Sequence, residues 1–318
     1  MHDINAAPIK FSVLREGALA RIGEQIATEV PCISTPFPTW NNACGEEGAR
    51  EGLARSWSVV VGGADGSGKT TLAINLAVHA VLNGNRVGFI NFEMTEVGLT
   101  QRYLSILSGI PQWKLSHGRL FKASEWEKAS EAANEAPGMM ITNSASVFSL
   151  SDIEEAYESL AKQGCKMMVV DYAQLVYAKA DDGVFQRTEA VANKLRELTH
   201  RYKVISIVVS QLNREGKKLG SKSPPSRHYL QGGGAWENNA NQIILIDHTL
   251  KRRDADRKVV YTRLLIDKNR HGPPVEIPVT WHLPNMRWEE GAQPSISVAA
   301  PEPKVAETKD MFDKGLEF

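Results

Sequence analysis

Several features that define whole classes of protein are scarce in this sequence of 318 residues. It has three cysteines, Cys32, Cys44 and Cys165, and their odd number and the lack of a CxxC pair argue against a disulfide framework and a structural zinc site. Its 37 Lys and Arg residues balance its 37 Asp and Glu residues, so the net charge gives no overall attraction to nucleic acid or to an anionic membrane. Any charged partner must therefore bind to a local patch.

Long hydrophobic runs are also missing. The most apolar stretches, 167–170 and 205–209, are far shorter than the roughly 20 residues that span a bilayer. Residues 1–5 lack the basic start of a signal peptide. We therefore expect a protein of a reducing cytoplasm, without a membrane partner.

The composition itself is ordinary, with 42% apolar and 7% aromatic residues, which excludes wholesale disorder and a collagen-like or mucin-like fibre. The length suits one α/β core of about 200–250 residues with extensions, or two small domains. We favour the single core.

From Trp57 onward, short β-branched runs alternate with helical stretches, a pattern typical of βαβ units and a mostly parallel twisted sheet flanked by helices. The expected strands are 57–62, 86–92, 139–142, 166–171, 203–210 and 241–247. The expected helices are 69–83, 95–108, 123–136, 149–163 and 184–202, the fourth with a capping signal that begins at Ser149. Residues 259–267 and 275–280 are expected to form a closing antiparallel pair.

The two ends of the chain differ from this core. Residues 11–27 have an apolar stripe at helical spacing, whereas Pro31 to Gly52 are too irregular for regular structure and are interpreted as a connecting segment. Residues 291–318 are rich in proline and are interpreted as a flexible tail. The predicted organisation is thus residues 1–52 as helix and connecting segment, 53–290 as the α/β domain, and 291–318 as the tail.

A complete G-x-x-x-x-G-K-[ST] pattern lies between an expected strand and an expected helix. Its glycines allow backbone N–H groups to face phosphates, Lys69 neutralises the β- and γ-phosphate oxygens, and the Thr70 hydroxyl binds Mg²⁺. The alternative is a Gly-rich turn that binds nothing. The predicted nucleotide-binding residues are Gly63, Ala64, Asp65, Gly66, Ser67, Gly68, Lys69, Thr70 and Thr71.

Three other strands end in polar residues, and the carboxyl edge of a parallel sheet is where ligands bind. Asp171 follows an apolar strand and is our candidate for the second Mg²⁺ ligand; capping of the next turn is the alternative. Glu93 is the candidate base that activates water, against a solvated strand-end residue. Gln211 is the candidate that senses the γ-phosphate.

These residues, together with longer strings around them, resemble the C-terminal RecA-like motor domain of the DnaB-type replicative DNA helicases. The resemblance runs from about residue 11 to Trp288 and is collinear. The strings that carry it beyond the P-loop are Asn91-Phe92-Glu93-Met94, Val170-Asp171-Tyr172-Ala173-Gln174-Leu175, Ser210-Gln211-Leu212-Asn213-Arg214 and Asp267-Lys268-Asn269-Arg270-His271-Gly272.

The resemblance implies roles for individual residues. Glu93 resembles the catalytic glutamate, Asp171 the Walker B aspartate and Gln211 the glutamine that senses the γ-phosphate. Lys268 and Arg270 resemble the finger pair that reaches into the neighbouring subunit's nucleotide; an ordinary solvated basic turn is the alternative. Residues 11–27 occupy the place of a helix that packs on the next subunit, against the alternative of packing on their own domain.

The resemblance has two departures. About ten residues precede the first expected helix, so we expect no N-terminal collar domain and no primase recruitment by that route. The family's DNA-facing loop usually carries an arginine, whereas the matching string here is rich in glycine. We interpret 212–234 as a mobile loop that lines a DNA channel, against a loop that touches nothing; its predicted DNA-binding residues are Lys217, Lys218, Gln231, Gly232, Gly233 and Gly234.

The resemblance thus implies a replicative helicase that forms a ring, expected to be a hexamer, hydrolyses Mg-ATP at subunit interfaces and moves 5′ to 3′ on single-stranded DNA. A RecA-like filament on single strands and an ATPase loader that does not translocate are the alternatives. The tail ends in a mixture of acidic and aromatic residues that is typical of docking peptides. Binding of other replication proteins by this tail is therefore a hypothesis, and a tail without a partner, the commoner case for disordered tails, is the alternative.

Overall fold

The computed structural model describes residues 32–45, 51–117, 122–135, 138–143, 148–171, 176–177, 184–219 and 223–291. The expected helix 11–27 and all of the expected tail except Gly291 lie outside these residues. Among the described helices, none is both long enough and apolar enough to cross a bilayer.

The described part of the chain is built on a sheet of nine strands in the order β13-β12-β11-β10-β3-β9-β7-β4-β5. The six strands from β10 to β5 run parallel, and β11, β12 and β13 are added antiparallel to them. The strands are β3 (Ser58–Gly63), β4 (Val87–Asn91), β5 (Met139–Asn143), β7 (Met167–Asp171), β9 (Ile205–Gln211), β10 (Gln242–Arg253), β11 (Val259–Asn269), β12 (Val275–His282) and β13 (Arg287–Glu290). The expected α/β fold is confirmed, and β13 is an addition to it.

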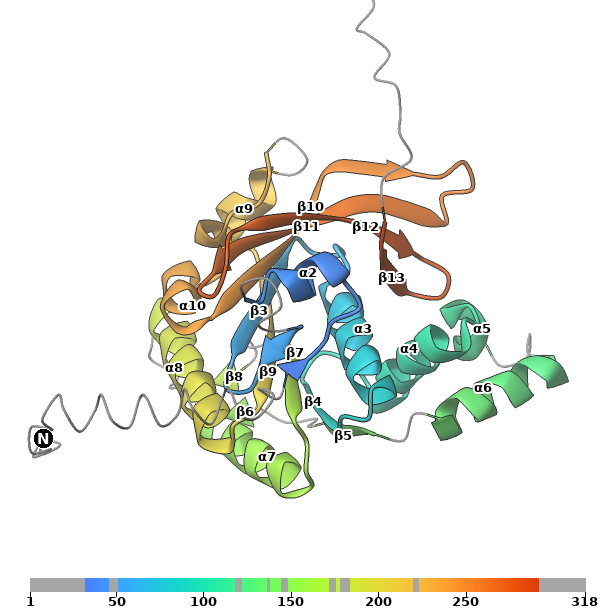
Figure 1. Cartoon of the computed structure of the whole chain (residues 1–318), viewed down its shortest axis with the longest axis horizontal. Coiled ribbons are helices and arrows are strands. Elements are labelled where there is room, and N and C mark those ends of the chain that lie inside the picture. The colour runs from blue at the N-terminus through green and yellow to red at the C-terminus, as the bar shows by residue number, and fades with distance from the viewer. Residues whose placement is uncertain are drawn as a thin grey trace, which may run out of the picture.

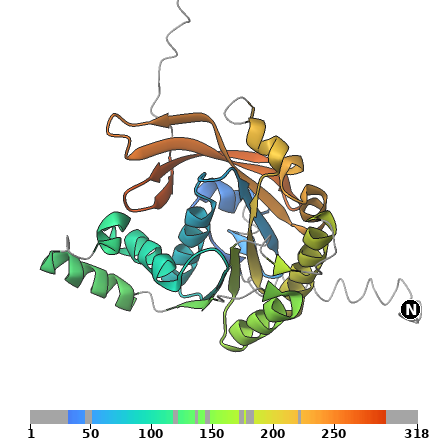
Figure 2. The same cartoon turned by 180° about the vertical axis from the view of Figure 1, so that it is seen from behind.

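Helices cover both faces of the sheet (Figure 1). Alternate residues of β3 show why: Val59 and Val61 pack with α3 and α4, whereas Val60 packs with α7 and α8. The helices are α3 (Lys69–Leu82), α4 (Glu96–Ser108), α5 (Gln112–Ser116), α6 (Ala123–Glu135), α7 (Leu150–Lys162), α8 (Val184–Tyr202), α9 (Arg214–Leu219) and α10 (Gly233–Asn239). Viewed from behind, the antiparallel strands extend beyond the parallel part of the sheet (Figure 2).

The N-terminal boundary of α7 follows from a local sequence signal that begins at Ser149. The Ser149 hydroxyl accepts a hydrogen bond from the backbone N–H of Asp152, and the Asp152 carboxylate accepts one from the backbone N–H of Ser149. This reciprocal capping box satisfies two N–H groups that would otherwise lack partners. The expected cap is confirmed.

The segment before β3 contradicts the expectation that residues 31–52 have no regular structure. It contains β1 (Cys32–Ile33) and α2 (Pro38–Asn42), and β1 pairs with β2 (Leu53–Ala54). Phe37 and Trp40 are completely buried, and the Trp40 indole donates a hydrogen bond of 2.9 Å to Gln242 on β10. Contacts with residues far away in sequence fold this segment onto the core, and its own proline-rich sequence did not reveal them.

The segment 212–234 also differs from the expected loop. Residues 214–219 form α9, and Leu212 pairs with Leu230 in an isolated antiparallel bridge. Gly232 has a φ of +75° at the N-cap of α10, and a Cβ there would lie 2.3 Å from a Thr188 side-chain carbon. The described part of this segment is therefore folded against the domain, with the glycine required by the close approach of α8.

Candidate nucleotide-binding site

The P-loop connects the end of β3 at Gly63 to the start of α3 at Lys69. Gly66 and Gly68 have φ values of +67° and +94°, a backbone conformation that other residues adopt only with strain. At Gly68 there is also no room, because a Cβ would lie 2.7 Å from the Trp288 ring and 3.1 Å from the Trp281 ring. The sequence therefore forms the tight strand-to-helix turn that aims backbone N–H groups at an anion.

Lys69 lies inside this turn with its side chain mostly buried. Its ammonium donates a hydrogen bond of 2.7 Å to the carbonyl of Ala64. Burial lowers the pKa of Lys69, and the nearby carboxylates of Asp65, Asp171 and Glu93 oppose this shift. The ammonium group is thus held over the loop by a weak carbonyl acceptor that phosphate oxygens can replace.

The register of the parallel strands brings the expected polar residues to one edge of the sheet. Gly63 pairs with Gln211, and Asn91 pairs with Asp171. A cavity of about 390 Å³ opens at this edge. Its lining includes the P-loop and the side chains predicted to act on the γ-phosphate, and its residues are Asp65, Gly66, Gly68, Lys69, Thr70, Thr71, Glu93, Arg102, Val209, Gln211, Trp281 and Met286.

The local backbone around Glu93 is fixed by its neighbours. The buried Asn91 side chain donates to the carbonyl of Met94 at 2.5 Å and accepts from the Met94 N–H at 3.1 Å. Thr95 then caps α4 by accepting a hydrogen bond from Gly98. Glu93 is exposed on this ordered turn and borders the cavity, where its carboxylate has access to water.

Asp171 is completely buried beside this cavity. Burial raises the pKa of its carboxyl to about 6, and Glu93 adds to the shift, whereas the Thr70 hydroxyl, Lys69 and Arg102 oppose it. Neither carboxylate oxygen makes a hydrogen bond of good geometry to a described residue. A buried carboxylate with unused oxygens beside a threonine hydroxyl suits a hard cation such as Mg²⁺.

The rest of that cation's coordination would come from elsewhere. The described residues contain no group of three or more His, Cys, Asp or Glu side chains arranged to hold a metal ion. Mg²⁺ commonly keeps several waters and binds through one or two protein ligands together with phosphate oxygens. Thr70 and Asp171 fit that mode and do not form a complete protein cage.

Replacing Asp171 with Asn tests the buried charge. Because the folded protein binds the proton more tightly than the unfolded chain, stability falls as the pH rises from about 4 to about 6, and the full cost remains above that range. The size of this pKa shift limits the loss of folding stability to about 3 kcal/mol. We therefore expect Asp171→Asn to raise the Tm of the nucleotide-free protein at about pH 7.5, and to raise it less at about pH 5.

Thermal unfolding followed by circular dichroism at both pH values measures this difference. Glu96→Gln, at an exposed carboxylate of α4 that does not border the cavity, is the matched control and should change the Tm little at either pH. A lower Tm for Asp171→Asn than for the natural protein at the higher pH would contradict the assignment of a buried, destabilising charge.

Arg102 is a site residue that the sequence analysis missed. It projects from α4 into the cavity, and its buried Nε has no hydrogen-bond partner among the described residues. Burial lowers its pKa, while Asp171 and Glu93 raise it. The signal in the sequence was an arginine within the apolar stripe of α4 that includes Leu99 and Ile106, a position where an unpaired cation is costly unless an anion is nearby.

Lys268 and Arg270 do not join this cavity. Lys268 pairs with Ile243 near the start of β10. This is the amino end of the parallel strands, and the P-loop lies at their carboxyl end. Lys268 donates to the carbonyl of Glu237, and Arg270 donates to the carbonyls of Ala240 at 3.2 Å and Asn238 at 2.7 Å. Burial lowers the pKa of Lys268 to about 8, with a further contribution from Arg270. Neither cation can therefore serve the nucleotide site of its own chain.

The residues predicted to bind DNA lie near the P-loop and near Gln211. The Lys217 ammonium forms an ion pair of 2.7 Å with Asp65, whereas Lys218 is exposed. The backbone N–H of Gln231 donates to the carbonyl of Gln211 at 2.9 Å. Gly233 is buried, and Gly234 is exposed in the first turn of α10. The structure thus connects this segment directly to the strand end that carries Gln211.

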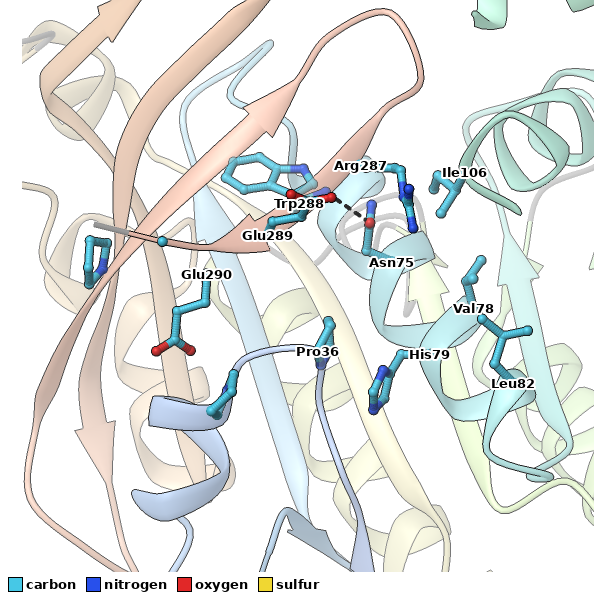
Figure 3. Close-up of a pocket in the computed structure, with 13 residues that line it drawn as sticks. Pro36, Asn75, Val78, His79, Leu82, Ile106, Arg287, Trp288, Glu289 and Glu290 are labelled. Atoms are coloured by element: carbon cyan, nitrogen blue, oxygen red, sulfur yellow. Dashed lines mark hydrogen bonds between the residues drawn. The ribbon is translucent and has the colours of Figure 1, made fainter. Parts of the chain in front are cut away.

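A second and larger cavity, of about 630 Å³, lies between α2, α3 and β13 (Figure 3). Its lining includes Pro36, Val78 and Leu82 but no residue of the P-loop. The candidate nucleotide-binding cavity is therefore distinguished by the P-loop that lines it and not by its volume.

The chain is similar to several known proteins. The family model described as "DnaB-like helicase C terminal domain" matches residues 47–290. A "Probable plasmid replicative DNA helicase" of Chlamydia trachomatis serovar L2 is 28% identical over 82% of this chain and 57% of its own length. The "Replicative DNA helicase DnaB" of Pasteurella multocida is 28% identical over 85% of this chain and 58% of its own. The chain thus spans a little over half the length of these relatives.

A solved structure of an isolated ATPase domain superimposes with a TM-score of 0.75 at 21% sequence identity. The match covers 87% of this chain and 98% of that one. The similarity therefore includes nearly the whole of a RecA-like ATPase fold.

Proposed function

Because the chain belongs to the DnaB-like helicase C-terminal domain family, we propose that it is an ATP-dependent replicative DNA helicase motor that moves 5′ to 3′ on single-stranded DNA. The observation that carries the proposal is the connection between its two sites. The strand end that bears Gln211 lies in the nucleotide cavity, and its carbonyl accepts a hydrogen bond from Gln231 in the predicted DNA-binding segment.

We propose that the substrate is ATP bound with Mg²⁺. The P-loop N–H groups and Lys69 bind the phosphates, and Thr70 and Asp171 hold the cation, which supplies charge neutralisation when it is bound. Glu93 accepts a proton from the attacking water. Arg102, which faces both carboxylates, adds positive charge where the γ-phosphate charge develops.

Gln211 is proposed to couple hydrolysis to DNA. Its amide can hydrogen-bond the γ-phosphate, so departure of that phosphate changes its position. Leu212 and Leu230 are bridged directly beyond it, and the Asp65–Lys217 ion pair joins the P-loop to α9. The same movement therefore reaches Lys217, Lys218 and residues 231–234, which are proposed to contact the DNA backbone.

A ring of identical subunits, six by family resemblance, is proposed to complete each site. Lys268 and Arg270 lie at the edge of the sheet away from their own P-loop, where they can face an adjoining copy. A cation supplied by the next subunit makes hydrolysis depend on assembly. The helix expected at 11–27 is proposed to pack on that neighbour.

We further propose a cytoplasmic location in a bacterium or a phage-infected host, and binding of other replication proteins by residues 291–318. Both rest on the sequence and on the family. A truncation after Glu290 that retains ATPase activity but loses co-purifying replication proteins would support the role of the tail.

The experiment that tests the helicase proposal is the ATPase rate with and without single-stranded DNA, taken alongside native mass. We expect single-stranded DNA to raise the ATPase rate severalfold. We expect the native mass to be that of a closed ring. A monomer that hydrolyses at full speed without DNA would contradict the proposal, and an open filament of variable mass would indicate the recombinase-like alternative.

A further inference from the structure

The hairpin of β12 and β13 is fixed against the P-loop helix by one buried side chain. Asn75 on α3 donates to the carbonyl of Met286 at 2.9 Å and accepts from the N–H of Trp288 at 3.0 Å. Figure 3 shows the second of these bonds. Asn75 is only 5% exposed, so water does not compete for these bonds. The hairpin turn is thus held over the first turns of α3.

Two tryptophans of this hairpin stack beside the P-loop. Trp281 and Trp288 are direct cross-strand partners with ring centroids 5.1 Å apart and ring planes 9° apart. Both rings lie close to Gly68, because a Cβ on that residue would be 2.7 Å from the Trp288 ring and 3.1 Å from the Trp281 ring. Trp288 is buried, whereas Trp281 is partly exposed and borders the nucleotide cavity together with Met286.

The order of the strands gives this cavity two chemically different ends. Glu93 follows β4 and Gln211 ends β9, and both strands lie on one side of β3 in the sheet. Trp281 and Met286 come from the β12–β13 hairpin, which lies on the other side of β3. A triphosphate that lies along the P-loop with its γ-phosphate toward Glu93 therefore points its sugar and base toward the tryptophan end.

We propose that Trp281 and Met286 form the nucleobase slot of this site, in which the flat base of a nucleoside triphosphate packs against the indole ring and the thioether. The Trp288 ring stacks on the Trp281 ring, and Asn75 keeps the hairpin in position through its hydrogen bonds. Stacking on an aromatic ring and contact with a polarisable sulfur suit a flat base. The slot rests on the proposed function only in requiring that a nucleoside triphosphate binds at the P-loop.

The test compares a ligand with a base and a ligand without one. Isothermal titration calorimetry with Mg²⁺ measures the Kd of a non-hydrolysable ATP analogue and of inorganic tripolyphosphate. We expect Trp281→Ala to weaken binding of the analogue about 5- to 100-fold, the range for loss of one base–aromatic stack, and to leave tripolyphosphate binding unchanged. Trp281→Phe, which keeps a flat ring, should restore most of the lost affinity.

Two further variants separate the causes. Lys69→Ala should weaken binding of both ligands, because it removes a phosphate contact. Trp126→Ala, at an exposed tryptophan of α6, is the matched control and should weaken neither. Unchanged affinity of Trp281→Ala for the analogue, or equal weakening for both ligands, would overturn the slot.

Failure of the slot and failure of the helicase proposal give different results. A protein that binds the analogue through Trp281 but shows no ATPase stimulation by DNA contradicts the helicase proposal and leaves the slot standing. A natural protein that hydrolyses ATP in a DNA-dependent manner while Trp281→Ala binds the analogue normally contradicts the slot alone. Absence of analogue binding by the natural protein would overturn both.

Discussion

Glu93→Gln is expected to lower the ATP turnover rate by about 10²–10⁴ and to leave the affinity for ATP nearly intact. The neutral amide has almost the same size as the carboxylate but cannot take a proton from the attacking water. The effect should be selective, because the turn that carries Glu93 is fixed by the Asn91 side chain and by the Thr95 cap, neither of which depends on its charge.

Steady-state ATPase assays and calorimetry with a non-hydrolysable analogue measure the two quantities separately. Glu96→Gln is the matched control, because Glu96 is exposed in the first turn of α4 and does not border the nucleotide cavity. A turnover rate for Glu93→Gln close to that of the natural protein would refute the role of Glu93 as the general base.

Arg270→Ala is expected to lower the ATPase rate of the assembled protein by at least about 10³, the lower end of the range for an arginine finger. The reason is geometric, since Arg270 lies at the sheet edge opposite its own P-loop and can act only on a neighbour's nucleotide. Its hydrogen bonds to the carbonyls of Asn238 and Ala240, at the C-terminal end of α10, hold it there.

Mixing experiments test whether the action is in trans. Arg270→Ala protein has an intact P-loop, and Lys69→Ala protein has an intact Arg270, so a mixture of the two should regain activity at mixed boundaries. The control is a mixture of Arg270→Ala protein with the double variant that carries both changes, which offers no complete boundary. No gain of the first mixture over the second would contradict a finger supplied by the adjoining subunit.

Loss of Arg270 also removes two hydrogen bonds at the C-terminal end of α10. A loss of stability therefore has to be distinguished from a loss of catalysis. Arg270→Lys keeps a cation near the α10 carbonyls but lacks the planar fork that binds phosphate oxygens in a bidentate manner. We expect Arg270→Lys to retain the natural Tm and still lose most of the activity.

A few residues of the sequence were enough to predict the candidate site at the carboxyl ends of the strands. The P-loop is local, since eight consecutive residues define its turn. Glu93, Asp171 and Gln211 are far apart in sequence. Asp171 and Gln211 each end an apolar strand and Glu93 follows one, and parallel strands bring their carboxyl ends to one edge. The cavity that contains Glu93 and Gln211, with Asp171 buried beside it, was therefore predictable without coordinates.

Other parts of the site had no local signal. Arg102 is a single basic residue on a helix, and its place beside Asp171 depends on how α4 packs. Trp281 and Trp288 meet only because a tight turn after His282 reverses the chain and Asn75 anchors that turn from more than 200 residues away in sequence. Residues 32–45 look like a linker in sequence, yet Trp40 is buried against β10.

By itself, the sequence determined the α/β class, most of the strands and helices, and the end of the cavity that the P-loop forms. These follow from hydrophobic periodicity, from glycine at positions of positive φ, and from the rule that parallel strands share an edge. Only the tertiary structure decided which side chains complete the cavity and which cations face away from it. Contacts of that kind depend on the packing of distant elements, and packing is a property of the whole fold and not of any one segment.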